Sequence, residues 1–193
     1  PFFQYEVTPL RSLRGVAGGR YDAIKYDFTN HLMPGANFGA PNEKRSFSHF
    51  SPKIGVTYTL PGGLNVYANV SEGFTAPDVS QLYGKSAIPD LKPATYRNYE
   101  VGARMSLLEN RLRLETAVYR LSGTDTIVSY TIAPGNSENR NAGRTRSQGV
   151  EFSALLDLAT VDARLGATVA SHRYQQYQVS SAQDYSGKEM PQA

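Results

Sequence analysis

Small or apolar side chains alternate with polar ones along most of this chain, and the clearest run lies between residues 64 and 71. One set is Leu64, Val66, Ala68 and Val70, and the other is Asn65, Tyr67, Asn69 and Ser71. A period of two residues predicts a β-strand with one apolar and one polar face. The strand ends at Phe74-Thr75-Ala76-Pro77, because proline cannot donate the hydrogen bond that pairing requires.

The same alternation predicts about eight strands in all. They cover residues 2–7, 13–23, 54–60, 64–71, 97–107, 112–130, 149–156 and 161–169. Tight turns such as Pro61-Gly62-Gly63 and Glu109-Asn110 alternate with longer loops, which we place at residues 28–47, 78–94, 133–140 and 178–193. We therefore expect an all-β fold, an antiparallel meander in nearest-neighbour order with no helix longer than two turns.

Strand length and turn asymmetry favour a membrane barrel over a soluble sheet. No run approaches the roughly 18 apolar residues of a membrane helix, so any spanning would be done by strands. A mean hydropathy of −0.43 fits a barrel, because each strand spends half its residues on a polar lumen. Several strands run past about ten residues, whereas sandwich strands are most often about 5 or 6. A soluble antiparallel β-sheet binding module is the alternative.

Charge and chemistry-bearing residues exclude several functions. A net charge of +3 is far too small to argue for a nucleic-acid partner. The three histidines, His31, His49 and His172, lack the spacing of metal ligands. No acid, base and nucleophile are placed together, so we expect no enzyme and name no catalytic, cofactor-binding or metal residue.

Several short motifs carry a family resemblance. They are Arg20-Tyr21-Asp22, Ser51-Pro52-Lys53-Ile54-Gly55, Phe74-Thr75-Ala76-Pro77, the segment from Ile88 to Ala94, Asn98-Tyr99-Glu100-Val101-Gly102, and the segment from Asn141 to Glu151. In this order they resemble the barrel of TonB-dependent outer-membrane receptors. The chain departs from the usual motifs at Thr75, Ile88 and Ala94, where the family has arginine, asparagine and glutamate.

The resemblance implies a location, a parent architecture and a function. The chain would be a section of a 22-stranded transmembrane β-barrel in the bacterial outer membrane. Residues 1–193 would be a partial barrel domain, lacking the plug domain and the remaining strands. The parent would take up a ferric siderophore, with energy from the TonB complex acting through the plug. Outer-membrane lipid would surround it, and no cofactor is implied, because iron would arrive as a chelate. A small closed eight-stranded outer-membrane barrel is the structural alternative.

Two groups of residues are candidate contacts. In the central loop, Tyr83, Lys85 and Lys92 could supply the aromatic and basic groups that bind a bulky anionic chelate. Haem receptors of the family typically place a histidine in this loop, and residues 78–88 contain none, which favours a siderophore. The candidate lumen-facing residues are Arg20, Asp22, Glu100, Arg104, Arg113, Glu115, Glu151 and Arg164. Their simpler role is to pair with one another across strands.

Overall fold

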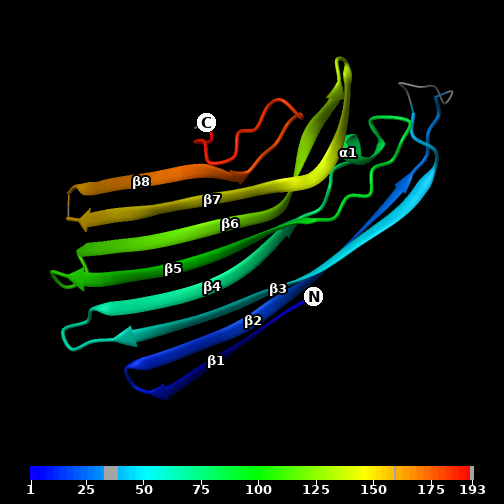
Figure 1. Ribbon diagram of the computed structural model, residues 1–193. Coiled ribbons are helices and arrows are strands. Elements are labelled where there is room, and N and C mark those ends of the chain that lie inside the picture. Colours follow the sequence, from blue (N-terminus) through cyan, green and yellow to red (C-terminus); the bar gives the residue numbers. More distant parts are fainter. Residues whose placement is uncertain (33–38, 159, 192–193) are drawn as a thin grey trace.

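A computed structural model describes residues 1–32, 39–158 and 160–191 of the chain. The described residues form eight strands and one short helix. The strands are β1 (Phe2–Leu10), β2 (Leu13–Phe28), β3 (Glu43–Thr59), β4 (Asn65–Thr75), β5 (Ala94–Leu107), β6 (Leu112–Ala133), β7 (Asn136–Asp157) and β8 (Asp162–Gln176), and the helix is α1 (Val79–Tyr83). The strands form a single sheet in the order β1 to β8, in which every neighbouring pair is antiparallel (Figure 1).

This arrangement confirms the predicted meander. β1 and β8 form the two outer edges of the sheet, which is therefore open, and the closed eight-stranded barrel is not the structure of this chain. The expectation of no helix longer than two turns also holds for the described residues, because α1 has five residues. Among the described residues, no helix is long and apolar enough to cross a membrane.

Several boundaries differ from the prediction. β1 continues to Leu10, through an irregularity in its pairing with β2, instead of turning at residue 8. β3 begins at Glu43, well before the predicted start at residue 54. The long loop predicted at residues 133–140 is wrong, because β6 and β7 continue as a hairpin with a tight turn at Pro134 and Gly135. Gly135 has a φ of 74°, which glycine adopts without strain.

The remaining long loops lie at the same end of the sheet as the tip of the β6–β7 hairpin, opposite the four short turns that join β1 to β2, β3 to β4, β5 to β6 and β7 to β8 (Figure 1). Residues 29–42 connect β2 to β3, and residues 76–93, which include α1, connect β4 to β5. Residues 33–38 of the first of these predicted loops lie outside the described part of the chain. Short turns at one end and long loops at the other are the pattern of an outer-membrane barrel, in which the long loops are extracellular.

The two faces of the sheet differ in chemistry. On one face the exposed side chains are predominantly apolar across β3 to β8, and they include Ile54, Val56, Val101, Val118, Val150, Leu165 and Val169. Val118 is 58% exposed and Leu165 is 63% exposed, although both are aliphatic. Large exposed apolar surfaces of this kind mark contact with another apolar phase. In a barrel this is the lipid-facing band.

Candidate functional site

The strand register places the predicted charged residues on the opposite, polar face. Residues paired directly across two strands share a face of the sheet, so Glu151, its partner Ala117 and the Ala117 partner Gly102 lie on one face. Every second residue along each of these strands lies on that face as well. All eight candidates share this face: Arg20, Asp22, Glu100, Arg104, Arg113, Glu115, Glu151 and Arg164. A transmembrane wall built this way would turn these charges toward a lumen and its apolar side chains toward lipid.

Tyr67 organises the centre of the polar face. Its hydroxyl donates a hydrogen bond to the Glu115 carboxylate at 3.3 Å. The Arg104 guanidinium lies over the Tyr67 ring, 4.7 Å from its centroid, and its Nη2 is 3.6 Å from Glu115 Oε1. Arg104 and Glu115 are direct cross-strand partners on β5 and β6. These two candidate residues therefore pair with each other across strands, and Tyr67 joins them to β4.

The other charged candidates are less connected. Arg20 and Asp22 form an ion pair at 2.7 Å along β2. Within the part of the chain that the structure describes, Arg113, Glu151 and Arg164 form no ion pair. If the polar face lines a lumen, these three side chains could contact solvent or the charged groups of a domain inside it. No existing ion pair would have to break.

A layer of loop residues packs over the same polar face, at the long-loop end. Leu82 and Tyr83 of α1 are buried in a cluster with Phe47 of β3, and Tyr26 packs against this cluster. Tyr26 and Phe47 lie on the same side of the sheet as Arg20 and Asp22, because the pairing of β2 with β3 gives their positions the same face. The helix and its loop therefore cover the charged side of the sheet and leave the apolar side bare.

Local sequence explains why a helix forms here. Asp78 caps α1 by accepting hydrogen bonds from the Gln81 N–H at 2.8 Å and the Ser80 hydroxyl at 2.6 Å. The Gln81 side chain in turn accepts a hydrogen bond from the Asp78 N–H, which completes a capping box. The hydrogen bonds from Ser80 and then from the Gln81 N–H lower the pKa of Asp78 from its ordinary value of 3.8.

Hydrogen bonds from three strands fix the central loop in place. The Asn141 side chain of β7 accepts a hydrogen bond from the Lys92 N–H at 2.7 Å and donates one to the Lys92 carbonyl at 2.8 Å. Asn139 donates to the Gln81 carbonyl at 2.9 Å. From the other side, Arg45 donates to the Pro89 carbonyl and Tyr26 to the Pro77 carbonyl, both at 2.9 Å. The loop is thus bonded to β2 and β3 on one side and to the β6–β7 hairpin on the other.

The three predicted loop contacts have different environments. Tyr83 is only 5% exposed, and its ring stacks on Phe28 with centroids 4.3 Å apart. Burial, and then the nearby Glu43 carboxylate, raise the pKa of this tyrosine. Lys85 donates hydrogen bonds to the carbonyl and hydroxyl of Ser137. The Lys92 side chain is exposed. In this arrangement Tyr83 and Lys85 hold the loop, and Lys92 is open to a solute. The ligand role of all three stays a prediction.

Sequence reasoning missed two residues that build this region. The alternation places Tyr67 on the polar face, but nothing in it indicates that the ring joins Glu115 and Arg104. Asn141 belongs to one of the motifs, and its role depends on the register that brings β7 beside the central loop. The motif was the available signal, because an asparagine amide can satisfy a backbone donor and a backbone acceptor together.

The open, one-sheet meander, with one apolar and one polar face, defines a class of protein: the wall of a transmembrane β-barrel. The family model described as "TonB dependent receptor-like, beta-barrel" matches residues 2–193. The chain belongs to this family of outer-membrane receptors.

Curated relatives are receptors for different solutes. The chain is 28% identical over 145 residues to the metal-pseudopaline receptor CntO of Pseudomonas aeruginosa, covering 74% of the chain and 20% of the relative. It is 26% identical over 170 residues to the ferrichrome outer membrane transporter/phage receptor of Escherichia coli, covering 88% and 21%. It is 30% identical over 140 residues to the vitamin B12 transporter BtuB of Vibrio vulnificus, covering 72% and 22%. The chain thus spans about a fifth of the length of these relatives.

Solved structures share the fold. The ferric yersiniabactin uptake receptor FyuA of Yersinia pestis superposes with a TM-score of 0.71 at 17% identity, over 98% of this chain and 28% of that one. The copper transporter OprC gives a TM-score of 0.70 at 16% identity, over 90% and 29%. At these identities the likeness shows the fold alone.

Proposed function

We propose that the receptor whose wall this chain helps to build takes up a ferric siderophore across the outer membrane, using energy from the TonB complex. The polar face would line the solute path beside a plug domain. The loops at the extracellular end would make the first contact with the chelate.

One observation carries this proposal: the charged wall and the covering loop lie on the same side of the sheet. Tyr26 and Phe47 hold α1 above the side that bears Arg20, Asp22 and Glu115. In a closed barrel, a loop held over this face would narrow the mouth of the lumen. The charged side chains of the wall would lie beneath the loop. Loops that cover a site can hold back a bound solute, so this layer suits a receptor that captures a bulky solute before it passes.

The chemistry of the chain suits a chelate. A siderophore brings its own iron ligands, so its receptor needs basic and aromatic contacts for a large, usually anionic molecule. Lys92 is exposed in the central loop, and Arg140 lies over the Tyr130 ring at 4.0 Å on the β6–β7 hairpin. Its curated relatives include a metal-pseudopaline receptor and a ferrichrome transporter. Metal chelates therefore recur among its relatives.

Uptake of radiolabelled solutes by cells that express the full-length receptor tests this function. Strains with and without the gene receive a panel of ferric siderophores, haem and cobalamin, with the TonB complex intact or deleted. We expect the gene to support uptake of at least one ferric siderophore, only when the TonB complex is present. Growth or uptake that depends on the gene with haem or cobalamin alone would overturn the solute assignment. Siderophore uptake that continues without TonB would overturn the energy source.

A further inference from the structure

The polar face of β1 to β4 carries a hollow of about 340 Å³. Five polar residues that line the hollow lie on this face: Gln4, Arg20, Ser51, Lys53 and Ser71. The strand register brings them together from four strands. Gln4 of β1 and Lys53 of β3 both pair with Gly18 of β2. Lys53 pairs in turn with Ser71 of β4. We call the five polar residues the donor cluster.

Two adjacent glycines of β2 determine what lies over each face of the sheet here. On the apolar face the ring of Phe50 covers Gly19, because a Cβ atom added to Gly19 would overlap that ring. Phe50 does not line the hollow, which therefore belongs to the polar face. On the polar face a Cβ atom added to Gly18 would lie 3.3 Å from Lys53 Cε. The Lys53 side chain thus lies over Gly18, beside the hollow.

The donor cluster has more hydrogen-bond donors than its own contacts use. Within the part of the chain that the structure describes, Lys53 forms no ion pair and no hydrogen bond. Arg20 binds Asp22 through its Nε at 2.7 Å, and its two Nη groups have no hydrogen-bond partner among the described residues. Ser51 is only 8% exposed, and its shielded hydroxyl also lacks a partner there. A buried hydroxyl without a partner costs free energy, so a ligand that accepts its hydrogen bond is favoured.

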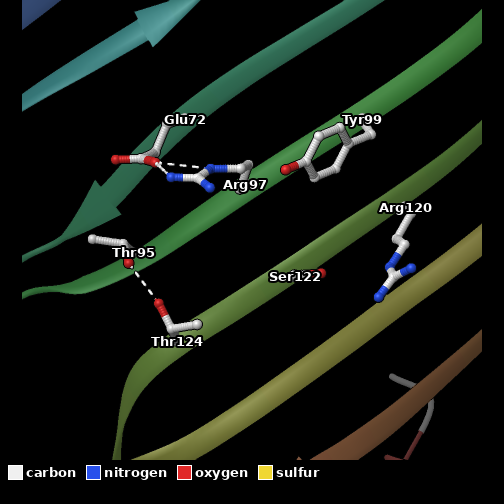
Figure 2. Close-up of a pocket in the computed structure, with 7 residues that line it drawn as sticks. All are labelled: Glu72, Thr95, Arg97, Tyr99, Arg120, Ser122 and Thr124. Carbon is white, nitrogen blue, oxygen red and sulfur yellow. Dashed lines mark hydrogen bonds and ion pairs between the residues drawn. The ribbon is translucent and has the colours of Figure 1, made fainter.

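The carboxylates beside the hollow already have partners. Asp22 accepts from Arg20, as described above. Glu72, which also lines the hollow, accepts a hydrogen bond from Arg97 Nη2 at 2.7 Å (Figure 2). Its other carboxylate oxygen lies 3.1 Å from Nε2 of His49. One positive charge, that of Lys53, is therefore left unbalanced beside free hydroxyl and guanidinium donors. Such a group of donors suits an oxyanion.

We propose that the donor cluster binds a carboxylate of the transported solute, so that the receptor prefers ferric chelates that carry a free carboxylate. This inference rests on the proposed function, because it requires the polar face to line the solute path. A single unbalanced charge matches a carboxylate better than a phosphate, which carries about −1.5 to −2.

The position and size of the hollow suit such a step. Ser51 lies four residues along β3 from Phe47, about 13 Å below the layer that α1 forms over this face. A solute that has passed the loop layer reaches the donor cluster next. A volume of about 340 Å³ is near the lower end of small-molecule sites, so the hollow holds one arm of a bulky chelate and not the whole molecule.

Amine footprinting of the wild-type, full-length receptor in detergent tests occupancy without any substitution. A water-soluble acylating reagent modifies exposed lysines, and mass spectrometry measures the rate at each one. We expect citrate at millimolar concentration to slow the modification of Lys53 severalfold, whereas its uncharged triethyl ester should not. Lys25, an exposed lysine on the other face of β2, is the internal control and should react at an unchanged rate. Equal rates at Lys53 with and without citrate would overturn the proposal. A Lys53 that is unreactive before any solute is added would also overturn it, because another part of the receptor would then occupy the site.

Uptake by cells tests the preference for carboxylates. The wild type should transport at least one ferric siderophore that carries a free carboxylate, and K53Q should lower that uptake about tenfold at low solute concentration. K53R keeps the charge and should retain most of the uptake, and K25Q should behave as the wild type does. Heat-modifiable mobility on a gel verifies that each variant folds.

The outcomes separate this site from the proposed function. Transport of haem or cobalamin alone would overturn the proposed function. Transport restricted to siderophores without a free carboxylate would overturn the donor cluster as a solute site and leave siderophore uptake intact. Equal uptake of a carboxylate-bearing siderophore by K53Q and the wild type would do the same.

Discussion

The ring of Tyr67 on β4 lies over Gly102, its direct partner on β5. A Cβ atom added to Gly102 would lie 2.4 Å from Tyr67 Cζ and 2.7 Å from the carbonyl oxygen of Thr116. The glycine thus makes room for the ring that donates to Glu115 and lies under Arg104. An aromatic ring that covers a glycine in the adjacent strand also shields the exposed backbone there.

Substituting this glycine should weaken the barrel. We expect G102A to cost about 1–3 kcal/mol in the full-length receptor, since the clash with the Thr116 carbonyl involves backbone and cannot be relieved by a rotamer change alone. Urea titration of folded receptor in detergent measures the change. The control is G73A on the same strand pair, where a Cβ atom would have no neighbour within 4 Å. Equal losses for the two variants would show that the Tyr67 ring and Thr116 are not the cause.

Sidedness predicts different effects for two neighbouring positions on β6. V118R places a charge on the apolar face and should cost about 2–4 kcal/mol if Val118 lies near the membrane midplane. E115Q removes a partly exposed partner of Arg104 on the polar face and should cost at most about 1 kcal/mol. Folding yield into lipid vesicles provides the comparison. Similar losses for the two variants would contradict the assignment of the faces.

Labelling of intact cells tests which end of the sheet faces outward. The chain contains no cysteine, so single engineered cysteines report without background from this segment. We expect a membrane-impermeant maleimide to modify N136C at the hairpin tip and to leave R111C unmodified. Permeabilised cells should label both sites, which controls for accessibility. Labelling of R111C alone in intact cells would show that the short-turn end, and not the long-loop end, faces outward.

Asn141 should control the order of the central loop. N141A removes both hydrogen bonds between this side chain and the backbone of Lys92. The Lys92 N–H and carbonyl then lack these partners. We expect a local loss of about 1–3 kcal/mol. Hydrogen exchange of residues 88–93 should accelerate accordingly. N136A, at the exposed hairpin turn, is the control. Unchanged exchange in N141A would mean that the other contacts of the loop suffice to hold it.

The helix cap predicts a pH dependence confined to α1. The pKa of Asp78 is lower in the folded loop than its ordinary value of 3.8. The stability that the charged Asp78 side chain contributes to α1 is therefore fully present above pH 3.8. It is lost as the pH falls below 3.8 toward the folded pKa, because protonation removes the charged acceptor. Hydrogen exchange at the Leu82 amide, which donates to the Asp78 carbonyl, reports this loss after correction for intrinsic rates. D78N should remove the pH dependence. An unchanged dependence in D78N would assign it to another group.

The alternation of side chains determined the strands, their two faces and the nearest-neighbour order. These features are local, because a period of two residues and a short turn each depend on adjacent positions. The charged candidates could therefore be assigned to one face from the alternation alone. The boundaries at the hairpin of β6 and β7 could not, because residues 133–140 are rich in turn-forming types and pair only when both strands continue together.

Only the tertiary structure decided which loop residues cover the polar face of the sheet. Tyr83 was predicted as an aromatic contact for a bulky chelate, and the fold buries its ring against Phe28 of β2, far earlier in the chain. Likewise, only the pairing register brings Arg97 of β5, Arg146 of β7 and Arg173 of β8 into one row on the apolar face. Contacts between residues so distant in sequence depend on register and loop packing, and a one-residue slip would turn each side chain to the other face.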